Sequence, residues 1–265
     1  MSYEVSRELK EKLIFLADKY EKPSFADSDP CQFLRWYSIE DKADVETAAF
    51  IAAMLAFGNR NQFIPKIREI LTLADKNESS NITSWIKSEK YKKDFQPANR
   101  LSQTSDCDLS KKFYRFYSYE DMHVFFDELR SILMAAPSLG DYFEKEWLDK
   151  GGNLSDLISE AFPKSKIVPK GKSSANKRIH MFLRWMVRQK SPVDLGIWSW
   201  YPQSQLLIPL DVHVMQEAVK MGLLSEKAAP SHKTDLMLTD CMKKVFPDDP
   251  CRADYSLFGL GVSSD

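Results

Sequence analysis

A chain of 265 residues is long enough for one large domain or two smaller ones, each with a hydrophobic core. Apolar residues make up 43% of the chain, and only 9 glycines and 13 prolines interrupt it. This composition excludes an intrinsically disordered protein and favours helices joined by short loops over a β-protein with many tight turns. The formal net charge of −1 argues against a nucleic-acid partner unless positive charge is concentrated locally.

No apolar run is long enough to cross a bilayer, and residues 1–10 are polar where a secretory signal would be apolar. We therefore expect a cytoplasmic protein that has no membrane partner. No cysteines form a C-x-x-C pair and the histidines are scattered, so neither a metal site nor a cofactor is expected. The thiols are expected to be free and buried, although Cys241 and Cys251 are close enough in sequence to bridge. The cysteines are Cys31, Cys107, Cys241 and Cys251, and the histidines are His123, His180, His213 and His232.

Apolar residues recur at helical spacing along most of the chain, which predicts an all-α fold. Residues 44–57 differ from the other helices because they are apolar on every side, so we expect a fully buried central helix that ends at Gly58. Residues 76–110 are polar and predict short helices and loops, while residues 191–210 form an aromatic-rich loop. The other expected helices span 4–20, 30–37, 63–73, 119–135, 139–148, 153–162, 177–190, 212–222, 233–246 and 250–258.

Positive charge is concentrated between Lys164 and Lys190, where nine basic residues occur without an acidic one. The rest of the chain then carries −10, and an acidic body with one basic segment suits a local anion site. Within this segment, helical spacing places Lys177, Arg184 and Arg188 on one face, opposite an apolar face.

Two motifs in the second half of the chain suggest chemistry. The turn at 168–171 leads into a helix whose first residues are small, and the free N–H groups of such a helix end bind phosphate. Taken alone, a lysine-rich loop of this kind is also typical of a solvated surface. Asp211, in the sequence Leu-Asp-Val-His-Val at 210–214, begins a helix, and a lone aspartate there is usually an N-cap.

Together, the two motifs resemble the endonuclease III-like glycosylases of the helix–hairpin–helix DNA glycosylase superfamily. Residues 210–214 are similar to the Val-Asp-Thr-His-Val-like context of the family's catalytic aspartate, and Lys177, 34 residues upstream, matches its nucleophilic lysine by position. That spacing is similar to archaeal 8-oxoguanine DNA glycosylase. The chain also resembles an uncharacterised bacterial family with that fold, through residues 177–188 and 258–261.

The chain departs from the superfamily pattern in three ways. The hairpin lacks the usual Leu-Pro-Gly-Val-Gly turn, and the four-cysteine iron–sulfur cluster is absent. An alignment on Ala175 and Asn176 would place Ser173 or Ser174 at the lysine position, so Lys177 is one of two readings.

The resemblance implies two helical lobes with a central cleft between them. Residues 46–210, with a hairpin at about 163–190, would form the barrel lobe, and residues 1–45 with 211–265 would form the second lobe. The implied activity is base-excision repair by a DNA glycosylase with β-lyase (AP lyase) activity on an oxidised purine, with 8-oxoguanine the first candidate.

Lys177 would attack C1′ of a flipped-out nucleotide and form a Schiff base. Burial and the nearby charges of Arg178 and Lys172 would favour its neutral amine. Asp211 would stay ionised at its helix N-terminus and stabilise positive charge on the sugar.

Further residues could contact the base or the DNA backbone. Asp254 and Phe258 have the spacing of an acid and an aromatic that contact the base in the archaeal enzymes, although a surface Asp and a core Phe are the simpler alternative. Asn59 and Gln62 could supply polar contacts or simply begin a helix, and Trp198 could stack on a base or plug the core. The residues expected at the DNA backbone are Lys170, Gly171, Lys172, Ser173, Ser174 and Arg178.

The expected partner is double-stranded DNA with a damaged base, bound by a monomer; no protein partner is indicated. Two other functions stay open: a nucleic-acid-binding protein of the same fold without catalysis, and a helical protein-interaction module in which residues 164–190 bind an acidic partner. Salt-dependent DNA binding without a trapped intermediate would indicate the first, and failure to bind any duplex at low salt the second.

Overall fold

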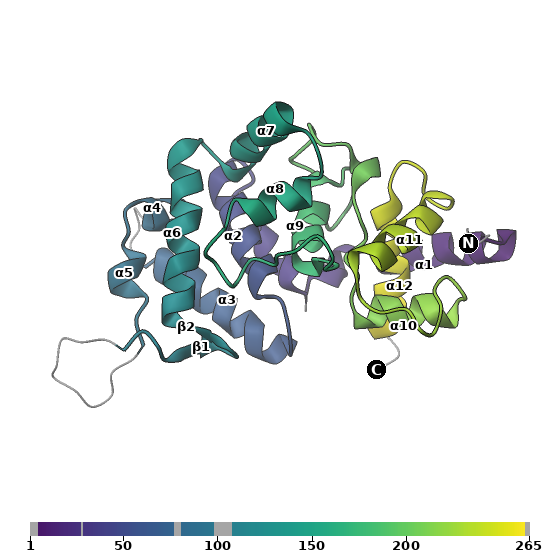
Figure 1. The fold of residues 1–265 in the computed structure, drawn as a ribbon, viewed down its shortest axis with the longest axis horizontal. Helices are drawn as coiled ribbons and strands as arrows, with labels where there is room; N and C mark the ends of the chain where they lie inside the picture. Colours follow the sequence, from purple (N-terminus) through teal and green to yellow (C-terminus); the bar gives the residue numbers. More distant parts are fainter. Residues whose placement is uncertain (1–4, 28, 77–80, 98–107, 263–265) are drawn as a thin grey trace. The chain divides into compact units, whose positions relative to one another are not determined.

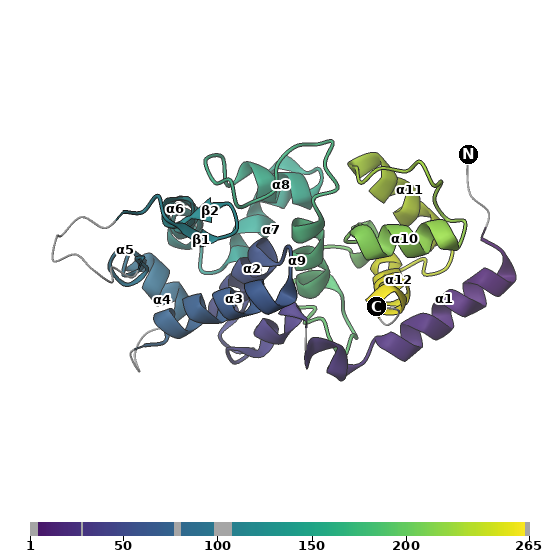
Figure 2. The same ribbon diagram turned by 90° about the horizontal axis from the view of Figure 1, so that it is seen from below.

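The computed structural model describes residues 5–27, 29–76, 81–97 and 108–262. Over these residues the protein is mostly helical, which confirms the predicted all-α class (Figures 1 and 2). The described ranges contain twelve α-helices, four 3-10 helices and one two-stranded hairpin. The contacts divide the chain into two compact units, a central unit of residues 33–169 and a terminal unit of residues 1–32 and 170–265.

The central unit is built around helix α2 (Lys42–Leu55), in which every residue from Asp44 to Leu55 is buried. This confirms the central helix predicted from its all-round apolar sequence. Two buried carboxylates on α2 accept backbone N–H groups from neighbouring helices: Asp44 from Thr83 at 2.9 Å and Glu46 from Gly140 at 2.7 Å. These N–H groups lie in the first turns of α4 and α7, so α2 caps both helices. The other helices of this unit are α3 (Arg60–Ala74), α4 (Ile82–Lys87), α5 (Tyr91–Asp94), α6 (Tyr119–Ala135), α7 (Leu139–Lys150) and α8 (Leu154–Glu160).

The central unit also contains an antiparallel hairpin of β1 (Lys112–Tyr114) and β2 (Tyr117–Ser118), which leads directly into α6 (Figure 1). The strands pair Lys112 with Ser118 and Tyr114 with Tyr117. Sequence analysis did not predict it, because strands of three and two residues are too short to show an alternating pattern.

The terminal unit joins the two ends of the described chain. Helix α12 (Ala253–Val262) packs against α1 (Arg7–Tyr20) and α10 (Val212–Lys220), and Ser256 donates a hydrogen bond to the carbonyl of Leu13 at 2.7 Å. Gly259 lies so close to Tyr20 that a Cβ atom there would come within 2.5 Å of the ring, so glycine is required at this contact. The unit also contains α9 (Lys177–Val187) and α11 (His232–Lys243).

The predicted hairpin region, residues 163–190, contains one α-helix, α9, instead of two. Pro163 and Pro169 have no N–H group to donate within a helix. The N–H groups of Lys164 and Ser165 bind the carboxylate of Glu128, at 2.8 and 2.9 Å, instead of a preceding carbonyl. Residues 161–176 therefore form turns.

The boundaries between the two units also differ from the prediction. They lie at 32/33 and 169/170, whereas 45/46 and 210/211 were predicted. Helix α9, expected in the lobe of residues 46–210, belongs to the terminal unit because its side chains pair with groups of that unit. No helix within the described ranges is long and apolar enough to cross a membrane. Cys31, Cys241 and Cys251 are free and buried, while Cys107 lies outside the described residues.

Removal of a core ring from α2 should destabilise the protein strongly. Phe50 is fully buried and its ring stacks on those of Phe125 and Phe162, with centroids 5.9 and 5.1 Å apart. We expect Phe50→Ala to lower the free energy of unfolding by about 3–5 kcal/mol. Met134→Ala, at a position 60% exposed, should change it by less than about 0.5 kcal/mol. Urea denaturation measures both, and equal midpoints for the two variants would contradict a core centred on α2.

Candidate active site

The terminal unit brings Lys177 and Asp211 together. Lys177 is the first residue of α9 and Asp211 is the N-cap of α10, and the Lys177 Nζ lies 3.0 Å from the Asp211 Oδ2. The Asp211 Oδ1 accepts the backbone N–H of Val214 at 2.9 Å, so the same carboxylate caps the helix and binds the lysine. The side chain of Lys177 is 35% exposed, which leaves its amine accessible, whereas that of Asp211 is 10% exposed.

The loop before Lys177 is held in place by local hydrogen bonds. Asn176 adopts a left-handed conformation (φ 44°), donates its side-chain amide to the carbonyl of Gly171 at 3.2 Å, and is buried. The loop is also bound to the start of α11, because the backbone N–H of His232 donates a hydrogen bond to the carbonyl of Ser173 at 2.9 Å. As a result, the side chains at 170–174 are exposed around the start of α9, as a phosphate-binding loop requires, while Arg178 is half-buried.

Asp254 lies near this pair. It is in the first turn of α12, is buried, and forms an ion pair with the guanidinium of Arg184 on α9. Burial raises the pKa of Asp254 to about 6, against the opposing effect of Arg184. Asp211 also raises the pKa of Asp254 and Lys177 lowers it, so all three residues interact electrostatically. Asp254 is thus neither a surface residue nor an isolated one.

The prediction that Arg184 and Arg188 belong to an exposed basic face of α9 is wrong. Their side chains are only 3% and 2% exposed, because carboxylates inside the terminal unit pair with them. Asp194 connects the two: its Oδ1 lies 3.3 Å from the Arg184 Nε and its Oδ2 lies 2.5 Å from the Arg188 Nη1. Arg188 also binds Glu21 at 2.9 Å and Asp249 at 2.8 Å.

The electrostatic consequence is that both guanidiniums stay charged. Burial alone would lower their pKa values, but the carboxylates, Asp194 first among them, raise the pKa of each arginine well above its ordinary value. Two of the nine basic charges between 164 and 190 are therefore neutralised inside the protein and are not available to an external anion.

The remaining predicted residues have different positions. Phe258 lies on α12, four residues after Asp254, and is half-buried. The centroid of its ring is 6.0 Å from those of Phe25 and His213. Trp198 is 1% exposed and packs against Phe182 and Trp200, with centroids 5.2 and 5.4 Å apart. Its ring belongs to the core and has no face for a base, which corrects the stacking role predicted for it.

Asn59 and Gln62 belong to the central unit and take no part in the Lys177 cluster of the terminal unit. Asn59 is the N-cap of α3 and accepts the N–H of Asn61 at 2.9 Å, while Gln62 is exposed in the first turn. This is the ordinary helix start that was the alternative reading.

Sequence analysis missed a buried pair near the start of α9. The His180 Nε2 and the Asp235 Oδ2 lie 3.7 Å apart, too far for a hydrogen bond, and neither atom has a hydrogen-bond partner among the described residues. Burial lowers the pKa of His180 to about 3, so its ring is neutral at pH 7, and burial raises the pKa of Asp235 well above its ordinary value. Within the described part of the chain, no group of three His, Cys, Asp or Glu side chains could hold a metal ion.

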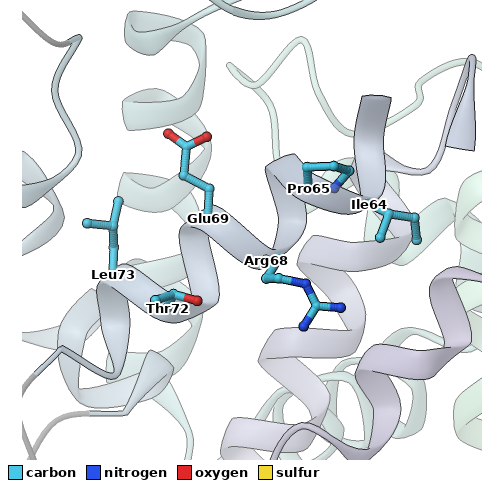
Figure 3. Close-up of a pocket in the computed structure, with 6 residues that line it drawn as sticks. All are labelled: Ile64, Pro65, Arg68, Glu69, Thr72 and Leu73. Atoms are coloured by element: carbon cyan, nitrogen blue, oxygen red, sulfur yellow. The ribbon is translucent and has the colours of Figure 1, made fainter. Parts of the chain in front are cut away.

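A surface pocket of about 490 Å³ lies on α3 in the central unit and is shown in Figure 3. Its lining side chains come from one helix, and the carboxylate of Glu69 and the guanidinium of Arg68 point away from each other, so no polar groups converge on a ligand position (Figure 3). The lining residues are Ile64, Pro65, Arg68, Glu69, Thr72 and Leu73.

Comparison with known proteins identifies a family. A family model described as a protein of unknown function (DUF2400) matches residues 29–263, which include α9 to α12 and therefore Lys177, Asp211 and Asp254. No curated protein and no solved structure matches the chain significantly.

The raised pKa of Asp254 predicts a pH dependence of stability. Between its usual pKa of 3.8 and its folded pKa of about 6, the unfolded chain has already lost the Asp254 proton and the folded protein still holds it. The folded state therefore loses stability relative to Asp254→Asn as the pH rises through this window, by up to about 3 kcal/mol.

Chemical denaturation of the native chain and Asp254→Asn at pH 4, 5, 6 and 7 measures this difference. A difference that is the same at all four pH values would show that Asp254 is not protonated in this range.

Proposed function

The chain belongs to the DUF2400 family, and we propose that it is a DNA glycosylase with lyase activity that excises an oxidised purine from double-stranded DNA. 8-Oxoguanine is the first candidate. The observation that carries this proposal is the Lys177–Asp211 pair: a primary amine and a carboxylate, 34 residues apart in sequence, lie 3.0 Å apart at the starts of two helices. The resemblance to helix–hairpin–helix glycosylases suggests the reaction, and the proximity of the amine and the carboxylate supports it.

The chemistry proceeds in two steps. The neutral amine of Lys177 attacks C1′ of the flipped-out nucleotide, the glycosidic bond breaks, and the departing base takes the bonding electrons and a proton. The nitrogen lone pair of Lys177 then forms the C1′=N bond, and the C1′–O4′ bond breaks. O4′ takes the bonding electrons and a proton from the Lys177 nitrogen, which leaves a Schiff base between Lys177 and C1′. Loss of a proton from C2′ and departure of the 3′ phosphate, with the C3′–O electrons, complete β-elimination and nick the strand.

Asp211 is placed to assist both the amine and the sugar. Lys177 must give up an ammonium proton before it attacks, and the Asp211 Oδ2 is an acceptor within hydrogen-bond distance. Once that proton has passed to the departing base or to solvent, the carboxylate faces the positive charge that grows at C1′. The Val214 N–H keeps the carboxylate oriented throughout.

The excised base and the DNA backbone would contact neighbouring residues of the terminal unit. Asp254 interacts electrostatically with Lys177 and, with Phe258 one turn later, would contact the excised base. The exposed loop at 170–174, together with Arg178, would bind the phosphates next to the flipped nucleotide.

The same ion pair also favours a second candidate, a nucleic-acid-binding protein of this fold without catalysis. In such a protein the carboxylate 3.0 Å away would orient the Lys177 side chain toward a DNA phosphate, and no covalent bond to DNA would form. The two candidates therefore differ in whether Lys177 becomes covalently attached to DNA.

Borohydride trapping tests the lyase, because borohydride reduces a Schiff base to a stable amine. A labelled duplex with one 8-oxoguanine, and a second with an abasic site, are mixed with the protein at low salt. We expect a covalent band with the native chain, none with Lys177→Gln, and a trapping rate lower by about 10²-fold in Asp211→Asn. Lys12→Gln, at an exposed position of α1, is the matched control and should retain the band.

The other results assign the function differently. A band that survives Lys177→Gln and disappears with Lys172→Gln or Lys170→Gln keeps the enzyme and moves the nucleophile. No band on either duplex, together with salt-dependent binding, rejects the lyase and supports the non-catalytic protein.

A further inference from the structure

The tip of the β1–β2 hairpin, residues Arg115 and Phe116, presents an aromatic ring to solvent. Phe116 is 58% exposed, whereas Tyr114 and Tyr117 on either side of the turn are buried. The ring is nevertheless held in place. It lies 4.6 Å from the Tyr117 ring and 5.3 Å from the Phe57 ring, and the Phe116 carbonyl accepts a hydrogen bond from the Lys112 Nζ at 2.9 Å.

Arg115 occupies a backbone conformation that favours glycine. Its φ is +50°, in the left-handed region that a side chain with a Cβ adopts at a cost of roughly 1 kcal/mol. The guanidinium lies 5.7 Å from the Phe57 ring and against Gly58, where a Cβ atom would come within 2.2 Å of the Arg115 Nη1. The arginine therefore adopts a strained backbone conformation, and its guanidinium is positioned beside Phe57 and Gly58 at the hairpin tip.

The surroundings of the ring are positively charged. Lys111, Lys112 and Arg115 lie within five residues, and residues 109–118 contain no acidic side chain. The nearest acidic residues in sequence are Asp108 and Glu120, on either side of this segment. The Asp108 carboxylate accepts hydrogen bonds from Ser110, and the positive charge of Lys111 also lowers its pKa. The Lys112 Nζ binds the Phe116 carbonyl, and the Arg115 guanidinium lies over the Phe57 ring.

We propose that this hairpin tip is a stacking site for an unpaired base of single-stranded DNA, with Phe116 against the base and the cations of Lys111, Lys112 and Arg115 against the neighbouring phosphates. A single strand alternates a π-face with a phosphate at every nucleotide, which matches an exposed ring flanked by cations. A purely apolar protein partner would match the ring but leave the cations unpaired. The inference rests on the proposed function for the class of ligand, nucleic acid, and not for the chemistry of Lys177.

Binding of a fluorescent ten-residue oligothymidine, followed by anisotropy at low salt, tests the ring. We expect Phe116→Ala to weaken binding about 5-fold or more, since stacking on one aromatic is worth about 1–3 kcal/mol per base. Phe15→Ala is the matched control, because Phe15 is 65% exposed on α1 of the terminal unit. Equal affinity of Phe116→Ala and the native chain, an equal loss in Phe15→Ala, or no binding of the oligonucleotide by the native chain overturns the inference.

Arg115→Gly separates a structural role from a binding role. Glycine relieves the strained φ, so the free energy of unfolding should stay the same or rise. On our inference the affinity nevertheless falls, and the slope of log K against log salt concentration decreases in magnitude by about 0.7, the value for one phosphate contact on a single strand. Unchanged affinity and slope in a folded Arg115→Gly variant overturn the role of the cations.

Trapping on the abasic duplex, run in parallel, distinguishes this inference from the proposed function. A native chain that traps DNA while Phe116→Ala binds the oligonucleotide normally refutes the stacking site alone. A native chain that traps nothing while Phe116→Ala loses oligonucleotide affinity refutes the lyase and supports the stacking site.

Discussion

The terminal unit depends on the burial of two guanidinium groups. Arg184 and Arg188 lie on the same side of α9, away from solvent, and a buried charge without a partner destabilises a protein by about 3–5 kcal/mol. Segments from distant parts of the chain must therefore each deliver a carboxylate to this helix. Glu21 comes from the end of α1 and Asp194 from the loop after α9. Asp249 directly precedes the 3-10 helix Pro250–Arg252, and Asp254 lies on α12. Because α9 begins with Lys177, the same packing that satisfies the arginines brings Asp254 near the candidate nucleophile.

Lys177 is paired with a carboxylate 3.0 Å away, whereas the proposed lyase mechanism needs its neutral amine. Under that proposal, a proton would leave Lys177 once DNA is bound. Asp211 is held by the α10 backbone and Asp254 by Arg184, while the Lys177 side chain is 35% exposed. In the proposed mechanism the lysine would therefore move toward the substrate while the two carboxylates stay in place.

Sequence reasoning predicted what local patterns encode. The all-round apolar run at 44–57 predicted the buried α2, and amphipathic spacing placed α6 at its observed bounds. Resemblance, not spacing, paired Lys177 with Asp211. Sequence reasoning could not predict that Arg184 and Arg188 are buried. Periodicity assigns cations to a solvent face unless their partners are known, and those partners lie up to 167 residues away. The sequence offered one signal for this burial. Arg184 and Arg188 are four residues apart on one helix, and an aromatic-rich loop follows that helix.

The discontinuity of the terminal unit has a consequence for how the protein is made. Helix α1 is synthesised before its partner α12, with the whole central unit between them. The central unit has its own core around α2. The Asp254–Arg184 ion pair requires α12, so a chain that stops before α12 contains Lys177 and Asp211 but not Asp254. In a chain that stops before Asp249, Arg184 and Arg188 each lack one of their carboxylates, which destabilises the terminal unit.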